Sequence, residues 1–224
     1  MKPLTSFFAA AFSVGLLALT LSGCSHFPHR QAGPDATRPV GGKSLNIIQL
    51  RDNVKATRLA LNRTTDALNR VPGSTAPQQA YEAFRVALTD FQKLADKTLQ
   101  ESADVRNRGR ELFAEWSAET ESIKDPEIRT AAEERRTILQ DSYNSMLTPL
   151  ITARADLSQV RSDLTDIQKA LALDLTPAGV DVTKNAIDRI NREATTSSQS
   201  LDAFAAQLDK IANALPAPTV QKVK

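Results

Sequence analysis

Four stretches of the chain repeat apolar or small residues at alternating steps of three and four. The first comprises Ile47, Leu50, Val54, Thr57, Leu61, Thr64, Leu68 and Val71. The second comprises Phe84, Leu88, Phe91, Ala95, Thr98, Ser102, Val105, Gly109, Leu112 and Trp116, and Ile123 continues it. This spacing places all members of a stretch on one face of an α-helix, along a seam that packs lengthwise against other helices. It therefore constrains the fold to long, side-by-side helices.

The third and fourth stretches continue the same pattern. The third comprises Leu150, Ala153, Leu157, Val160, Leu164, Ile167 and Leu171, extended backwards by Ile128, Leu139, Tyr143 and Met146 with one stutter. The fourth comprises Val180, Thr183, Ile187, Ile190, Ala194, Ser197, Leu201, Phe204, Leu208, Ile211 and Leu215. Pro149 lies inside the third stretch, and it is expected to kink that helix or to break it, because proline removes a helical hydrogen bond.

Short turn sequences separate the four stretches. We expect Pro77 and Pro126 in the first turns of their helices, with Asp125 and Thr176 as N-caps. Connections this short join antiparallel neighbours. The predicted fold is all-α, an elongated antiparallel up-down helical bundle or coiled coil of about four long helices. Residues 44–215 would form it as one domain, and residues 216–224 would be a disordered tail. The second and third helices are longer than the first, so part of the bundle is expected to be a two-helix hairpin.

Hydroxyl side chains occupy several seam positions where leucine or isoleucine would be usual. They are Thr57, Thr64, Thr98, Ser102, Thr183 and Ser197. Such side chains can donate to a carbonyl of the preceding turn. Two interpretations stay open: a thin coiled coil with hydrated layers, or a bundle that opens for a partner.

The N-terminus has the pattern of a lipoprotein signal peptide. Lys2 precedes an uncharged apolar stretch over residues 4–20, which is short for a membrane span. Leu21-Ser22-Gly23-Cys24 follows, and it resembles the lipobox of bacterial lipoproteins. Residues 1–23 are thus predicted to be removed by cleavage between Gly23 and Cys24. Cys24 would then carry an S-diacylglycerol and an N-acyl group, which together give stable anchoring to a membrane.

Residues 24–43 are predicted to be a lipidated flexible tether, since the segment is rich in proline and glycine. His26 and His29 lie in it, and we expect them to be solvated rather than metal ligands. Ser25 follows the modified cysteine. By resemblance to lipoprotein sorting in Gram-negative bacteria, a residue other than aspartate there favours the outer membrane, facing the periplasm.

The residues of the predicted helices offer little chemistry. Cys24 is the single cysteine of the chain, and both histidines precede residue 30, so neither a thiol nucleophile nor a histidine-based triad or metal site fits the helical part. Acid pairs such as Glu133–Glu134 and Asp188–Glu193 lie among arginines and indicate solvated faces. We expect no enzyme and no cofactor. A net charge of +2 does not favour nucleic-acid binding.

One motif of the second stretch resembles a known family. Leu112, Phe113, Glu115 and Trp116 match the Leu-Phe-x-Glu-Trp core of the domain-of-unknown-function family 2959, and Met146 with Pro149 matches a methionine and proline that follow it. The order of helices is similar from about residue 45 to 215. The resemblance implies a helical, envelope-associated protein in which these four motif residues are structural. The family implies no biochemical activity.

Three hypotheses for function follow. The leading one is a lipid-anchored cell-envelope protein whose helical bundle acts as a structural, spacing or partner-binding module with a protein partner in the envelope. The second is a carrier that holds an apolar or amphiphilic ligand between helices. The third is a tether to the cell wall through the basic C-terminal tail with Lys222 and Lys224.

Overall fold

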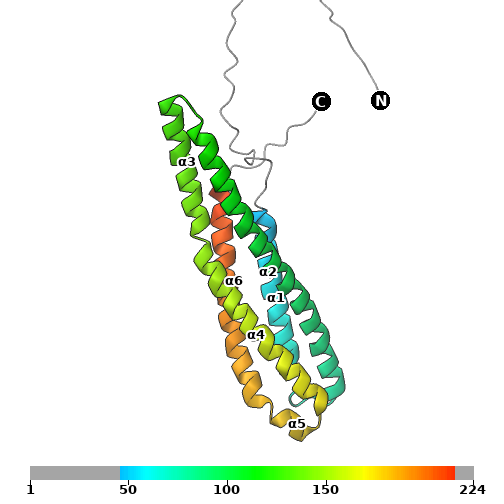
Figure 1. Cartoon of the computed structure of the whole chain (residues 1–224). Helices are drawn as coiled ribbons and strands as arrows, with labels where there is room; N and C mark the ends of the chain where they lie inside the picture. Colours follow the sequence, from blue (N-terminus) through cyan, green and yellow to red (C-terminus); the bar gives the residue numbers. More distant parts are fainter. Residues whose placement is uncertain (1–45, 215–224) are drawn as a thin grey trace, which may run out of the picture. The chain divides into compact units, whose positions relative to one another are not determined.

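A computed structural model describes residues 46–214, which fold into helices without any strand. The helices are α1 (Ile47–Asn69), α2 (Pro77–Glu121), α3 (Pro126–Asn144), α4 (Leu147–Leu173), α5 (Pro177–Asp181) and α6 (Lys184–Ala214) (Figure 1). The all-α prediction is confirmed. The predicted signal peptide, tether and tail lie outside the described residues, as do Gly23 and Cys24.

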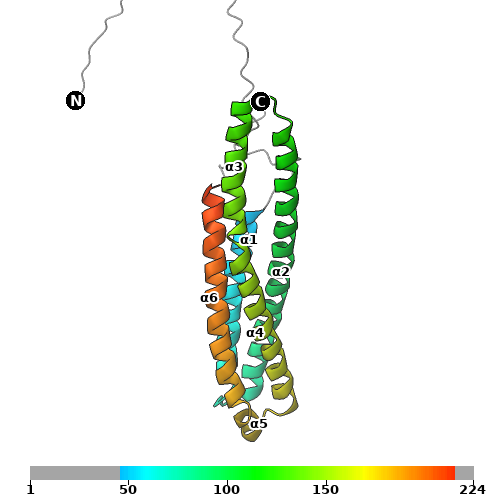
Figure 2. The same ribbon diagram turned by 60° about the vertical axis from the view of Figure 1, so that its left-hand side comes forward.

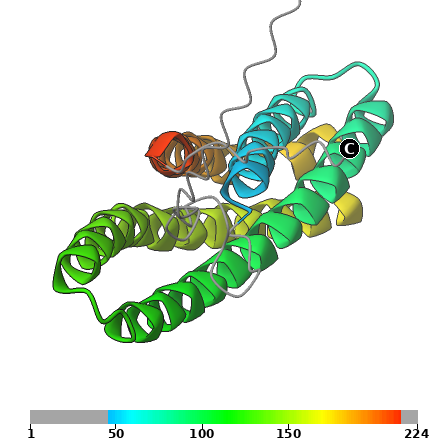
Figure 3. The ribbon, with the colours of Figure 1, turned by 90° about the horizontal axis from the view of Figure 1, so that it is seen from above.

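The long helices run antiparallel to their neighbours in the chain, except that α4 continues in the direction of α3. α1 packs against α2 and α6, while α4 packs against α6 and α2. Seen from above, α6 and α1 lie side by side, with α2 and the α3–α4 pair across from them (Figure 3). This is the up-down bundle that the short connections predicted.

The core of the bundle follows the predicted seams. Phe84, Phe91 and Phe204 are the largest fully buried side chains. The seam residues of α1, α4 and α6 within the described part are all buried, threonines and serine included. Burying this many apolar side chains from water is the main favourable term for such a fold.

One prediction about the seam needs correction near the turn between α2 and α3. Trp116 is half-buried and packs against the core, as predicted. Ile128, predicted to extend the third stripe, is 57% exposed. The reason is that the first half of α3 has no helix beside it except α2, so one face of the stripe meets solvent.

The predicted caps are confirmed. The Asp125 carboxylate accepts from the backbone N–H groups of Glu127 and Ile128 at 2.9 and 3.1 Å. The Thr176 hydroxyl accepts from the N–H of Gly179 at 3.2 Å. Pro77 and Pro126 each occupy the first turn of a helix. The Asp125 and Thr176 side chains thus satisfy N–H groups that have no partner within the helix.

The third and fourth predicted segments are each divided in two. α3 ends at Asn144 and α4 begins at Leu147, so the chain breaks rather than kinks. Pro149 lies in the first turn of α4, where a missing N–H costs little, and the carbonyl it would have met belongs to Ser145 in the break. In the fourth segment, a turn at residues 182–183 separates α5 from α6.

α2 is the longest helix, with 45 residues, which corresponds to about 68 Å. Its C-terminal part and α3 continue past the ends of α1 and α6 (Figures 1 and 2). We call this helical hairpin, residues 106–144, the arm. It confirms the prediction that part of the structure is a two-helix hairpin.

Candidate functional site

Tyr143 of α3 contacts α2 at the base of the arm, where the arm meets the bundle. The Tyr143 hydroxyl donates to the carbonyl oxygen of Arg106 at 2.8 Å. The ring lies directly against Gly109 of α2, where a Cβ atom would overlap with it. Glycine is therefore required for this close approach, which explains a glycine in the interior of a long helix despite its low helix propensity.

Three aromatic rings cluster beside this contact. The Phe113 ring lies 5.4 Å from the Tyr143 ring between centroids, in a tilted arrangement. It also stacks on Trp116 at 6.5 Å with an interplanar angle of 10°. Tilted and offset ring pairs of this kind are favourable beyond the area that they bury.

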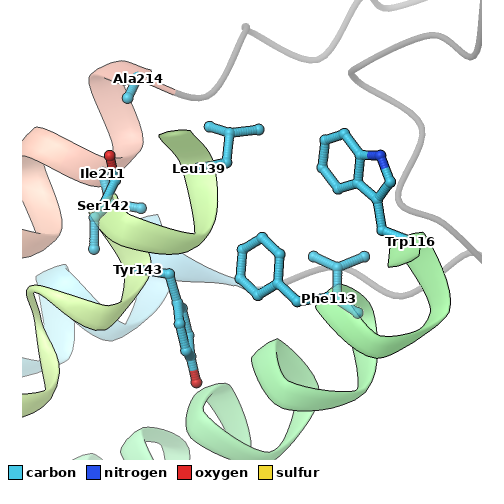
Figure 4. Close-up of a pocket in the computed structure, with 8 residues that line it drawn as sticks. Phe113, Trp116, Leu139, Ser142, Tyr143, Ile211 and Ala214 are labelled. Carbon is cyan, nitrogen blue, oxygen red and sulfur yellow. The ribbon is translucent and has the colours of Figure 1, made fainter. Parts of the chain in front are cut away.

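An apolar hollow lies where the bundle ends and the arm begins. It is small, with a volume of about 30 Å³, and is lined by Leu112, Phe113, Trp116, Leu139, Ser142, Tyr143, Ile211 and Ala214. Phe113 lies at its centre, while the Tyr143 hydroxyl points away from it (Figure 4). Residues from α2, α3 and α6 thus meet here, and the last turn of α6 forms one wall. The lining contains no charged side chain, so the hollow suits an apolar group.

A second hollow lies against the Phe113 and Tyr143 rings, and its other lining residues are different. It is an open groove of about 330 Å³ between α2 and α3, lined by Arg110, Phe113, Ala114, Ser117, Arg136, Gln140, Tyr143 and Asn144. Burial raises the pKa of Tyr143, and the positive charges of Arg110 and Arg106 oppose that rise. The groove therefore combines an aromatic floor with a positive rim.

Comparison with family models places this arrangement in a known sequence family. The family described as "Protein of unknown function (DUF2959)" matches residues 49–215, which is most of the chain. The chain belongs to this family. Comparison with curated proteins and with solved structures finds no match.

The motif residues of the DUF2959 domain lie at this junction. Leu112, Phe113 and Trp116 line the apolar hollow, whereas Glu115 does not. Met146, the first residue of the second family motif, is fully buried at the break between α3 and α4. These residues thus lie on the two sides of the junction between bundle and arm, and the apolar ones among them pack there.

One acid pair was missed by the sequence analysis. Glu193 lies beside Asp163 of α4, rather than with Asp188, and the two carboxyl groups share a hydrogen bond. Arg189 approaches both, at 3.9 Å from Asp163 and 3.5 Å from Glu193. Burial and the Asp163 carboxylate raise the pKa of Glu193, while hydrogen bonds from Glu193 and Gln159 lower the pKa of Asp163. Only the packing of α4 on α6 brings these residues together. Nothing in the local sequence therefore indicates that they are neighbours.

The remaining predicted site residues are outside this site. Gly23, Cys24, His26 and His29 all precede residue 46 and lie outside the described residues. Between residues 46 and 214, no cluster of three or more histidine, cysteine or acidic side chains could hold a metal ion. No helix in that range is both long and apolar enough to cross a membrane.

Proposed function

We propose that this DUF2959 protein is a lipid-anchored cell-envelope protein whose helical domain spaces and binds a protein partner. The anchor is Cys24, the modified first residue after cleavage at Gly23, and the membrane is the outer membrane on its periplasmic side. The lipobox sequence supports the anchor, and the helical domain acts without catalysis or a cofactor.

The arm is the observation that carries the binding role. α3 buries only Leu139 and Tyr143. It leaves Ile128 and Ile138 exposed, at 57% and 66%. A hairpin that continues past the bundle adds little core of its own, yet it presents apolar side chains where a partner can reach them. Exposed apolar side chains on an element with so little core of its own support an interaction surface there.

The arm extends from the end of the bundle at which α1 begins. Residue 46 precedes α1 there, so the chain from Cys24 enters the bundle at the arm end. A tether attached at that end would hold the arm within reach of the membrane and of other proteins on it.

Metabolic labelling with radiolabelled palmitate tests the anchor. We expect the wild-type protein to incorporate label and Cys24→Ala to incorporate none, with Cys24→Ala released from the membrane fraction. Equal labelling of the two proteins, or no labelling of the wild type, would refute the anchored function.

The apolar hollow supports a second candidate, the binding of an apolar or amphiphilic ligand. The ligand would occupy the junction, because the bundle seams themselves are filled by side chains. Native mass spectrometry of the purified protein would reveal a co-purified lipid, and the substitution Phe113→Ala should change its occupancy.

The cell-wall tether through Lys222 and Lys224 lies outside the described residues and stays a prediction, which the protein content of purified sacculi would test.

A further inference from the structure

Two arginines face the groove of the arm without a carboxylate partner. Arg110 donates to the amide oxygen of Asn107 at 2.8 Å, and Arg136 donates to the amide oxygen of Gln140 at 2.7 Å. Some arginines of the described residues are paired with acids, as Arg161 is with Asp96. No ion pair of the described residues includes Arg110 or Arg136, and these two also line one groove.

Arg136 gives the stronger evidence for a bound ligand, because part of its guanidinium group is buried. Its Nε atom is inaccessible to solvent and has no hydrogen-bond partner among residues 46–214. A buried donor of a charged group that lacks a partner is costly, and native structures normally supply an acceptor. The neighbouring polar residues of the groove, Ser117 and Asn144, carry no charge and leave the guanidinium groups uncompensated.

The location adds a second line of support. Arg110 and Arg136 come from facing helices and line the same groove. Arg106 lies one turn before Arg110, and its positive charge also acts on Tyr143 at the floor of the groove. No acidic side chain lines the groove. A planar guanidinium fork matches the oxygens of phosphate, and two forks around one site favour a dianion.

We propose that the groove between α2 and α3 binds a phosphate group, with Arg110 and Arg136 as its two ligands. Phosphate monoesters and free phosphate share this chemistry. The groove is open and exceeds the size of the ion, so it also admits the body of an esterified ligand such as a lipid headgroup. This site goes beyond the proposed function, since it requires neither the anchor nor a protein partner.

Isothermal titration calorimetry on the full-length protein in detergent tests the proposal with two probes. One is inorganic phosphate, and the other is dihexanoyl phosphatidic acid, a lipid with a monoester headgroup. We expect binding of at least one probe. Tighter binding of inorganic phosphate would identify a free phosphate site, and tighter binding of the short-chain lipid would identify a headgroup site.

Substitutions then assign the binding to the groove. Arg110→Gln and Arg136→Gln should each weaken binding at least tenfold, because each removes one charged fork. Arg136→Lys, which keeps the charge but loses the fork, should weaken it less. Arg135→Gln is the matched control, since Arg135 is exposed next to Arg136 in α3 and does not line the groove.

Nuclear magnetic resonance of the arginine side chains gives a readout that does not depend on affinity alone. The Nε–H signal of Arg136 should shift on addition of the bound probe, and circular dichroism melting should confirm that the variants remain folded. Absence of binding by both probes would overturn the proposal. Equal weakening by Arg135→Gln and Arg136→Gln would also overturn it, because that result indicates a diffuse effect of net charge.

Discussion

Single residues decide how the arm is joined to the bundle. Gly109 permits the Tyr143 ring to lie on the backbone of α2, and the hydroxyl of that ring then reaches the carbonyl of Arg106. Phe113 packs on the same ring and connects it to Trp116. The junction thus depends on one small and several large side chains that fit each other, and a change in volume there should be felt.

Gly109→Ala should destabilise the protein by about 1–3 kcal/mol, because the added methyl group overlaps with the Tyr143 ring. In an open helix position, the same change would stabilise by up to about 1 kcal/mol. Urea unfolding of the variant would measure the sign. The double variant Gly109→Ala/Tyr143→Ala is the control, and it should lose less than the sum of its single changes. A more stable Gly109→Ala protein would contradict the contact.

The Asp163–Glu193 pair predicts a dependence of stability on pH. Because the pKa of Glu193 is raised in the folded protein, protonated Glu193 contributes to the free energy of unfolding. This contribution is fully present below about pH 4. It is lost as the pH rises through the raised value. The lowered pKa of Asp163 acts in the opposite sense, since its contribution is lost as the pH falls through that value.

Glu193→Gln keeps a donor for Asp163 but cannot ionise. Its melting temperature should therefore exceed that of the wild type near neutral pH and converge with it near about pH 4. Glu133→Gln is the control, because Glu133 is exposed on α3. Parallel pH profiles of the wild type and Glu193→Gln would contradict the shared hydrogen bond.

At the scale of elements, the seams of the helices could be predicted and the places where helices divide could not. A 3.5-residue period records which residues face a neighbour, so the buried faces of α1, α4 and α6 followed from it. The same period continues through the breaks at residues 145–146 and 182–183, because the chain resumes on the same face after each turn. At the junction, the motif residues were visible in the sequence. The groove arginines and the Asp163–Glu193 pair required the packing of two helices, which no local pattern records.

Most of the seam hydroxyls form hydrogen bonds within the protein. Thr57 and Thr98 bond to each other across α1 and α2 at 2.8 Å. Thr64 donates to the carbonyl of Ala60 at 2.8 Å in its own helix and also contacts that of Ala87 in α2 at 3.1 Å. Ser197 differs, because its hydroxyl is buried without a protein partner.

These differences predict opposite effects of removing hydroxyls. Thr57→Val should destabilise by about 1–2 kcal/mol, since it leaves the buried Thr98 hydroxyl without its partner. Ser197→Ala should stabilise by up to about 1 kcal/mol, because it removes an unsatisfied group and improves helix propensity. Thermal unfolding of both variants measures this. Destabilisation by both to the same degree would show that Ser197 has a partner.

The whole molecule combines a well-packed bundle with a thinly packed arm. α6 buries nine residues along its length, whereas α3 buries two. Local opening is least costly where few apolar contacts are broken. The helical domain is therefore expected to be stable around α1, α4 and α6 and more dynamic toward the turn between α2 and α3, where the proposed partner binds.

Hydrogen exchange measured by mass spectrometry should report this gradient. Amides of residues 127–138 in α3 should exchange faster than amides of residues 187–208 in α6, because the arm can open without the bundle. Uniformly strong protection of all helices would contradict a dynamic arm, and it would also contradict a bundle that opens for a partner.

Site-specific photo-crosslinking in intact cells tests the central claim, that an anchored protein binds its partner through the arm. A photoreactive residue would replace Ile138 in the arm or, as a matched control, Leu59 in the bundle; their exposed fractions are 66% and 53%. We expect one discrete protein adduct from position 138, its loss when Cys24→Ala is added, and none from position 59. Equal adducts from both positions, or an adduct from position 59 alone, would contradict it.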